Sequence, residues 1–295
     1  MSNSFNMKVF EKFFIKHIKA IVICAGIAGL ILFLGMLRGY IAVPNAITIG
    51  PLELRLYGFV IALGMVVVIE LVKRHAPFVT EEHSINGLFW VIIPGIIGAR
   101  MWHVASEYYL YSGNFSEVFA IWHGGLSIFG AMVGGIIGGG AYAWKEKLPI
   151  VKTLEYIALF FPIGHAIGRF GNFFNQEIFG PPTNLPWGVF IEKVYRPMEY
   201  ADYDYFHPAF LYEVIGNFII FSILYSIYKR SGVTGSGEIL AWYIMLYGIM
   251  RYILSFIRLD PDAVTTMSFV TSAGMVGLGL IMIIILNIWK YKCAS

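Results

Sequence analysis

The sequence predicts an all-α membrane protein that crosses the bilayer about eight times. Of its 295 residues, 58% are hydrophobic and only 13% are charged, and the mean hydropathy is +0.71. Apolar runs close to the ~20 residues that cross a bilayer recur along the chain. Basic residues gather between these runs, which is typical of cytoplasmic loops. The net charge of +3 is too small to indicate nucleic-acid binding.

Eight apolar runs are expected to form the membrane helices. A few are shorter than a full span and need flanking aromatic residues to reach both interfaces. The runs lie near residues 20–37, 56–72, 86–105, 121–144, 153–168, 209–228, 237–257 and 267–289.

The positions of lysine and arginine orient these spans. With eight spans, five basic clusters fall on one side, which the positive-inside rule assigns to the cytoplasm together with both termini. Lys193 and Arg196 are exceptions on the other side, where most acidic connections lie. The clusters are Lys8, Lys12, Lys16 and Lys19; Lys73 and Arg74; Lys145, Lys147 and Lys152; Lys229 and Arg230; and Lys290 and Lys292.

The amino-terminal run, Ala20–Leu37, is expected to be an uncleaved signal anchor, because it is near spanning length and no clear cleavage site follows it. Residues 1–46 then form a basic cytoplasmic segment and an added helix, and 47–295 form the core. Cys24 and Cys293 do not indicate a disulfide framework. No Cys or His pair has the spacing of metal ligands, so no metal is expected.

Two segments have alternative interpretations. Gly130, Gly134 and Gly138 form a smooth stripe in the fourth span, which suits close packing of a neighbouring helix or a groove for an acyl chain. Residues 181–208 form the longest polar connection. They are expected to be either a small outward-facing cap or an interfacial loop with an aromatic belt.

The most polar stretch of this apolar chain is Gly168–Gly180, which reads Gly-Arg-Phe-Gly-Asn-Phe-Phe-Asn-Gln-Glu-Ile-Phe-Gly. The predicted topology places it at the outer face, just after the fifth span. Ionisable groups in or near a span usually face a polar cavity, and arginine is suited to gripping a phosphate. Other polar residues expected toward this face are Arg100, Arg251, Arg258, Tyr57, His103, His207 and Glu213.

This stretch resembles the signature of the prolipoprotein diacylglyceryl transferase family. Further segments resemble the family in the same order: Ile49-Gly50-Pro51, Leu56-Tyr57-Gly58, Trp122-His123-Gly124-Gly125-Leu126-Ser127, Pro186-Trp187, His207-Pro208-Ala209-Phe210-Leu211-Tyr212-Glu213, Tyr247-Gly248-Ile249-Met250-Arg251-Tyr252 and Arg258. The resemblance covers residues 47–289 and implies a seven-helix core, to which the span at 20–37 is an addition.

The resemblance implies a bacterial enzyme of the inner, cytoplasmic membrane with its active site toward the outer face. It would move the diacylglyceryl group of phosphatidylglycerol onto the lipobox cysteine of a preprolipoprotein, form a thioether and release glycerol phosphate. Its partners would be these two substrates and membrane lipids, with no cofactor, metal or nucleic acid. The alternatives are a diverged relative that uses another phospholipid or thiol acceptor, and a lipid-binding or transport protein without catalysis.

This chemistry assigns expected roles to individual residues. Arg169 and Arg251 would stabilise the leaving phosphate, and Glu177 would orient an arginine or accept a proton. The remaining residues expected to contact substrate are Arg258, Arg100, Asn172, Asn175, Tyr57, Gly180 and His207.

Three departures from the family pattern affect these roles. Phe129 stands where a histidine is common, so the base is unassigned among His103, Glu177 and His207. Ser255 replaces an acidic residue that would pair with an arginine, which leaves more of that work to Glu177. Glu155 replaces an aspartate in the fifth span.

Overall fold

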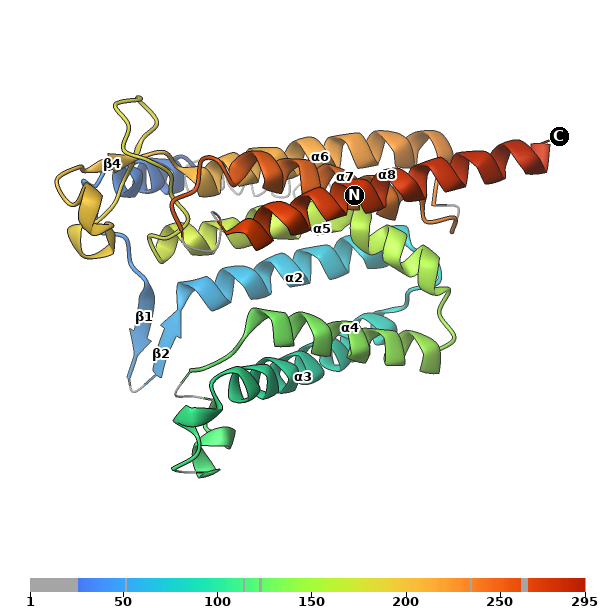
Figure 1. Cartoon of the computed structure of the whole chain (residues 1–295), viewed down its shortest axis with the longest axis horizontal. Helices are drawn as coiled ribbons and strands as arrows, with labels where there is room; N and C mark the ends of the chain where they lie inside the picture. Colours follow the sequence, from blue (N-terminus) through green and yellow to red (C-terminus); the bar gives the residue numbers. More distant parts are fainter. Residues whose placement is uncertain are drawn as a thin grey trace, which may run out of the picture. The chain divides into compact units, whose positions relative to one another are not determined.

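The computed structural model describes residues 26–50, 52–113, 115–121, 124–233, 235–260 and 265–294. Within these ranges the chain is mostly helical (Figure 1). Its eight α-helices are a segment with described bounds Gly26–Leu37, then α2 Leu56–His75, α3 Glu81–Ser106, α4 Ile128–Lys145, α5 Ile150–Phe174, α6 Ala209–Ser231, α7 Glu238–Leu254 and α8 Thr266–Ala294. Four 3₁₀ turns lie at Tyr108–Leu110, Phe115–Phe119, Lys193–Tyr195 and Met198–Tyr200, and the strands are β1 Ala46–Ile49, β2 Leu52–Arg55, β3 Val189–Phe190 and β4 Tyr205–Phe206.

Each predicted span corresponds to one of these helices. Five are long and apolar enough to cross a membrane: α2, α3, α5, α6 and the stretch Ser268–Trp289 of α8. Helix α4 has 18 residues and α7 has 17, and the glycines of α4 lower its hydropathy. The expected fold class, an all-α polytopic membrane protein, is confirmed. Cys24 and the lysines before the first span lie outside the described residues.

The described chain divides into two compact units. The first comprises the chain up to Val60, Arg169–Glu213 and Ile253–Ser268. The second comprises Ile61–Gly168, Val214–Tyr252 and the chain from Phe269. The boundary between the units therefore falls within α5, and its last turn and a half, from Arg169 to Phe174, belongs to the first unit.

The first unit has an aromatic core beside a small antiparallel ribbon. β3 pairs with β4 in the register Val189↔Phe206 and Phe190↔Tyr205. Phe206 is completely buried and packs with residues of α5, α6 and the amino-terminal helix; the cluster is Leu37, Phe173, Phe179, Val189, Ile191, Phe206 and Phe210. The segment 181–208 thus has strands and buried side chains of its own, and its outward-facing position remains a prediction.

A second ribbon in the first unit precedes α2. β1 and β2 are antiparallel with the register Ala46↔Arg55 and Ile49↔Leu52. Gly50, which follows β1 directly, has a φ of 61°. Glycine adopts that left-handed conformation without the steric cost that a side chain brings. The ribbon leads directly into Leu56, the first residue of α2.

In the second unit, glycines bring α3 and α4 into backbone contact (Figure 1). A Cβ on Gly130 would stand 2.1 Å from the Gly98 carbonyl oxygen, and one on Gly138 would stand 1.9 Å from that of Trp90. Gly134 is equally close to the carbonyl oxygen of Pro94. These contacts support the packing interpretation of the glycine stripe, because a larger residue at any of the three positions would force the helices apart.

Glu155 joins α5 to the amino-terminal end of α7 within the second unit. The side chain is completely buried. Its Oε2 accepts from the Gly235 amide at 2.8 Å, and its Oε1 accepts from the amides of Gly237 at 3.1 Å and Ile239 at 3.2 Å. A carboxylate is favourable at a helix amino terminus, where backbone N–H groups lack partners in the helix. Glu155 therefore fixes the loop that begins α7.

Candidate active site

The polar stretch at 168–180 begins as helix and ends in a tight turn. α5 continues through Phe174, and the amides of Asn175 and Glu177 then bond back to the carbonyls of Gly171 and Asn172 at 3.0 Å. Gln176 and Ile178 have φ values of 50° and 57°. Positive φ is costly for residues with side chains, and such strain gathers at functional sites. The turn brings Glu177 back beside the helix end.

Arg169, Asn172 and Glu177 form a hydrogen-bonded chain at this turn. Arg169 Nη1 donates to Asn172 Oδ1 at 3.2 Å. Asn172 Nδ2 donates to Glu177 Oε1 at 2.7 Å, and Asn175 Nδ2 donates to the same oxygen at 3.4 Å. Asn172 is buried, whereas Glu177 is exposed. Glu177 is thus linked to Arg169 through Asn172, and its role in catalysis stays a prediction.

Glu213 connects Arg169 to Arg258 across the first unit. It is the fifth residue of α6 and is completely buried. Its Oε2 pairs with Arg169 Nε, and its Oε1 accepts from Arg258 Nη1 at 2.8 Å. A carboxylate buried this deeply requires such partners, because an unpaired charge in an apolar interior is costly.

Asp260 holds the far side of Arg258. Its two carboxylate oxygens accept from Arg258 Nε and Nη2, both at 2.6 Å. Burial acts to lower the pKa of Arg258, but the hydrogen bonds to Asp260 and the charge of Glu213 outweigh it and raise that pKa. Ser255, buried nearby in sequence, bonds instead to the Ser268 hydroxyl at 3.3 Å. Arg258 thus pairs with the carboxylates of Asp260 and Glu213, in place of the acidic residue that the family pattern has at the position of Ser255.

Three of the five N–H groups of Arg169 are not used by Glu213 and Asn172: one on Nη1 and both on Nη2. Its side chain is 14% exposed. Nε faces Glu213 and Nη1 faces Asn172, while Nη2 has no protein partner within the part of the chain that the structure describes. A guanidinium held on one edge and open on the other is ready to grip an anionic oxygen with paired donors.

Glycines in the first unit allow the backbone and ring contacts around this cluster. A Cβ on Gly171 would stand 2.8 Å from Tyr57 Cδ2, so glycine lets the Tyr57 ring lie against α5 beside Asn172. A Cβ on Gly180 would stand 2.6 Å from the Ile257 carbonyl oxygen. Gly180 also donates its amide to the His207 carbonyl at 2.8 Å. The close approach expected at Gly180 is thus made to the protein's own chain.

His207 belongs to a hydrogen-bonded row in the first unit. His207 Nδ1 lies 2.9 Å from the Tyr212 hydroxyl, and Trp187 Nε1 donates to that hydroxyl at 3.1 Å. The row joins the segment 181–208 to the first turn of α6. Trp187 itself is 49% exposed, so the row reaches the surface of the unit.

In the second unit, Arg100 is buried against the loop that follows α3. It donates to five backbone carbonyls: Val118 at 2.9 Å from Nε, Gly124 at 2.6 Å and Gly125 at 2.9 Å from Nη1, and Glu117 at 2.5 Å and Ala120 at 3.3 Å from Nη2. All five guanidinium N–H groups therefore have acceptors. This arrangement anchors the loop, and contact of Arg100 with a phosphate stays a prediction.

The remaining predicted residues also lie in the second unit. Arg251 is partly buried in the last turn of α7, and His103 lies one turn after Arg100, with Nδ1 2.9 Å from the Tyr111 hydroxyl. His123 lies outside the described residues. The structure thus gathers Arg169, Asn172, Asn175, Glu177, Gly180, Tyr57, Arg258 and His207 in the first unit, and places Arg100, His103 and Arg251 in the second.

Sequence reasoning missed the roles of Asp260 and Tyr111. Asp260 follows Arg258 by two residues, and this spacing could have predicted a local ion pair. From the sequence, the segment was identified only as one of the acidic connections on the outer side. Tyr111 gave no signal, because its partner His103 is fixed by how the loop folds. Among the described residues, no group of three or more His, Cys, Asp or Glu side chains could hold a metal ion.

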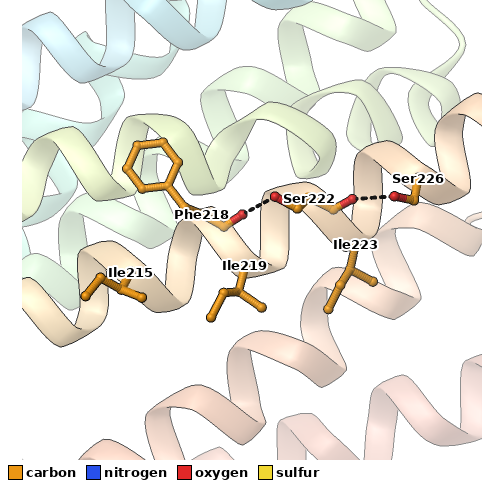
Figure 2. A pocket seen from close by; sticks show the side chains of 6 residues that line it. All are labelled: Ile215, Phe218, Ile219, Ser222, Ile223 and Ser226. Carbon is orange, nitrogen blue, oxygen red and sulfur yellow. Dashed lines mark hydrogen bonds between the residues drawn. The ribbon is translucent and has the colours of Figure 1, made fainter.

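A separate pocket of about 440 Å³ lies on α6 in the second unit (Figure 2). Its two hydroxyls do not offer donors, because Ser222 and Ser226 both donate at 2.8 Å to carbonyls one turn earlier. The pocket is therefore an apolar helix face suited to lipid contact. Its lining residues are Ile215, Phe218, Ile219, Ser222, Ile223 and Ser226.

Comparisons with known proteins agree with the motifs. The family described as prolipoprotein diacylglyceryl transferase matches residues 44–285. The chain is similar to the phosphatidylglycerol–prolipoprotein diacylglyceryl transferase of Thermotoga maritima, with 38% identity over 72% of this chain and 73% of the relative. It is also similar to those of Acaryochloris marina, with 31% identity over 81% and 88%, and of Synechocystis, with 35% identity over 74% and 79%. The chain therefore belongs to the prolipoprotein diacylglyceryl transferase family.

Proposed function

We propose that this protein transfers the diacylglyceryl group of phosphatidylglycerol to the lipobox cysteine of a preprolipoprotein. The observation that carries the proposal is the Arg169 guanidinium, held by Glu213 and Asn172 and open at Nη2, in a chain that belongs to this family. The products are a thioether-linked lipoprotein precursor and glycerol phosphate.

The reaction is a substitution at a glycerol carbon. The cysteine sulfur attacks as a thiolate, because the thiol is a poor nucleophile. A carbon–sulfur bond forms as the bond between that carbon and the phosphate oxygen breaks, and the oxygen leaves with the electron pair. Charge therefore develops on the leaving phosphate, and donors aimed there lower the barrier. Arg169 Nη2 is the donor that we assign to this role.

The cluster around Arg169 in the first unit carries a net negative charge. It holds two arginines, Arg169 and Arg258, and three carboxylates, Glu177, Glu213 and Asp260, which leaves one net negative charge. An anionic phosphate entering such a cluster needs a further cation. From the family pattern in Tyr247-Gly248-Ile249-Met250-Arg251-Tyr252 alone, we propose that Arg251 also stabilises the leaving phosphate.

The other predicted residues have positioning roles in this proposal. Asn175 and Tyr57 lie beside the Arg169 chain and offer hydrogen bonds to the glycerol or phosphate oxygens, while Arg258 fixes Glu213 and therefore Arg169. We assign His207, which follows β4 of the ribbon, to contact with the peptide substrate. Holding the glycerol carbon and the sulfur in line accounts for a large part of such a reaction's rate.

We place the enzyme in the bacterial inner membrane with its active site toward the outer face. The basic clusters support cytoplasmic loops on the opposite side. The exported cysteine and the headgroup of phosphatidylglycerol are both available at that outer face. The atoms and charges of the reaction balance with these two substrates alone, so we propose no cofactor.

The test is a reconstituted transfer assay. The purified protein is placed in vesicles that contain phosphatidylglycerol and is incubated with a peptide bearing a lipobox cysteine. Mass spectrometry should show the diacylglyceryl thioether, with an equal amount of glycerol phosphate, and Arg169→Ala should abolish both. Binding of the lipid without release of glycerol phosphate would indicate the lipid-binding alternative. Product formed only with another phospholipid would indicate the diverged relative.

A further inference from the structure

The amino-terminal helix precedes the part of the chain that matches the family. Its described bounds are Gly26–Leu37, whereas the match begins at residue 44. This helix and the cluster around Arg169 nevertheless belong to the same compact unit. The contacts between them therefore show what this added helix does for the site.

One side of the amino-terminal helix packs against the end of α5. The centre of the Phe33 ring lies 5.8 Å from that of Phe170 and 5.1 Å from that of Phe173. Phe173 is buried and follows Arg169 by four residues. Residues at that spacing lie on the same side of a helix. Phe33 thus packs against the helical turn that carries Arg169.

The other side of the amino-terminal helix is apolar and exposed. Ile27, Ile31 and Leu34 recur at helical spacing, and their exposed fractions are 54%, 63% and 49%. Such a stripe suits contact with lipid, and an anchor in the membrane needs nothing more. The contacts that Phe33 makes with α5 are therefore not explained by anchoring.

The turn after this helix is bound to the ribbon of β3 and β4. The Tyr205 hydroxyl donates to the Arg38 carbonyl at 3.2 Å. The guanidinium carbon of Arg38 lies 5.7 Å from the centre of the Tyr205 ring, within the range of a cation–π contact. Gly39 has a φ of 75°, and a Cβ there would stand 2.5 Å from the Phe190 ring. The backbone of the turn thus lies directly on β3.

Leu37 joins these two sets of contacts. Its side chain is buried in the cluster that contains Phe173 of α5 together with Val189 and Phe206 of the ribbon. The amino-terminal helix therefore contacts both the helical turn that carries Arg169 and the ribbon that His207 follows. It fixes how these two parts of the first unit are placed relative to each other.

We propose that the amino-terminal helix is a positioning element of the transferase site, with Phe33 and Leu37 as its positioning residues. The inference rests on the proposed function, in which Arg169 contacts the leaving phosphate and His207 the peptide. In-line attack of the sulfur on the glycerol carbon requires both substrates in one geometry, and a misplacement of ~1 Å costs about 10²-fold. Loss of the helix contacts should therefore lower kcat and leave the binding of each substrate nearly unchanged.

The first test compares Phe33→Ala with Leu34→Ala in the vesicle assay. Activity is divided by the folded fraction of each preparation, so that a loss of stability alone does not change the result. We expect kcat of Phe33→Ala to fall about 10- to 100-fold, with KM for phosphatidylglycerol and for the peptide within about threefold of the wild type. Phe33→Leu refills much of the space and should regain most of the loss. Leu34→Ala, on the exposed side, should keep the wild-type kcat.

A milder variant tests the contact with the ribbon. Tyr205→Phe removes the hydroxyl that donates to the Arg38 carbonyl and keeps the ring. We expect a loss in kcat of about two- to fivefold, in line with one hydrogen bond. Tyr203→Phe is the control, because Tyr203 is 55% exposed and lies two residues earlier in the same segment.

Hydrogen exchange follows the same contacts without any substrate. The amides of Thr183 and Ile191 donate to the carbonyls of Tyr205 and Asp204. Amides protected by such bonds exchange when the structure opens locally. Both should exchange faster in Phe33→Ala than in the wild type, and Leu34→Ala should match the wild type.

The inference is overturned if Phe33→Ala and Leu34→Ala have the same kcat per folded molecule, because the helix would then be an anchor only. It is also overturned if Phe33→Ala raises KM and keeps kcat. If Phe33→Ala does not fold, Phe33→Leu and Tyr205→Phe decide, and wild-type kcat in both refutes the positioning role. A wild type that forms no thioether refutes the proposed function, whereas one that forms it while these variants keep its kcat refutes only the positioning role.

Discussion

Arg169 and Arg100 occupy similar places in the sequence but are used differently. Each lies near the last turns of an apolar helix, and each is mostly buried. Arg100 donates all five N–H groups to carbonyls of a single loop, whereas Arg169 is held by Glu213 and Asn172 and keeps Nη2 open. The number of donors already satisfied within the protein therefore distinguishes an arginine that builds a loop from one that is prepared for a ligand.

The largest effect that tests this comparison is expected from Arg169→Lys. Lysine keeps the charge but loses the planar paired donors. Removal of one well-placed donor to developing charge costs about 10²- to 10³-fold in kcat, so we expect a loss of that size. Thermal unfolding of the detergent-solubilised protein should change little, because lysine keeps the positive charge that the buried Glu213 carboxylate requires.

The paired variant Arg100→Lys should behave in the opposite way. An ammonium has three donors, so at least two buried carbonyls lose their partner, at roughly 1–3 kcal/mol each. We expect a clear fall in unfolding temperature and protease cleavage between residues 107 and 127. A stable Arg100→Lys protein with the same catalytic loss as Arg169→Lys would mean that both arginines bind the phosphate.

Glu213→Gln should reduce both activity and stability by intermediate amounts. The neutral amide leaves Arg169 and Arg258 without their shared counter-charge, and hydrogen bonds to charged groups contribute about 1.5–3 kcal/mol. We expect a fall in unfolding free energy of that size and a loss in kcat of about 10- to 100-fold. Glu199→Gln serves as the control, because Glu199 is an exposed carboxylate in the same unit.

The smallest effects are expected from two glycine substitutions, one on each side of the comparison. Gly125→Ala places a Cβ at positive φ beside Arg100, at a cost of about 1–3 kcal/mol, and should lower the stability of the protein. Gly171→Ala brings a Cβ within 2.8 Å of the Tyr57 ring, which can shift, so about 1 kcal/mol is expected. If the two variants lost the same unfolding free energy, the backbone around Arg100 would be no more rigid than the backbone around Arg169.

The sequence predicted the helices correctly, because the lengths of the apolar runs determine them, and the local motif at 168–180 identified residues that the structure brings together. Arg169, Asn172 and Glu177 lie within nine residues, so one turn at the end of α5 brings them together. Partners that depend on chain folding could not be predicted. The pairing of Glu213 with two arginines joins three separate segments, and the pairing of His103 with Tyr111 depends on a loop that five carbonyl contacts hold in place. Whether the predicted site residues contact substrate is a matter for the assays above.

The buried position of Glu155 has a consequence for biogenesis. Its nearest hydrogen-bond donor, the Gly235 amide, is separated from it by 80 residues of chain. Synthesis is vectorial, so α5 reaches the translocon well before those donors have been made. A carboxylate without partners is unfavourable in lipid, and we therefore expect this end of α5 to wait at the cytoplasmic surface until the loop at 235–239 emerges. An arrest peptide fused after increasing lengths of the chain reports the force on the nascent chain. It should show a late peak in this force as the loop at 235–239 leaves the ribosome, and Glu155→Ala should abolish that peak.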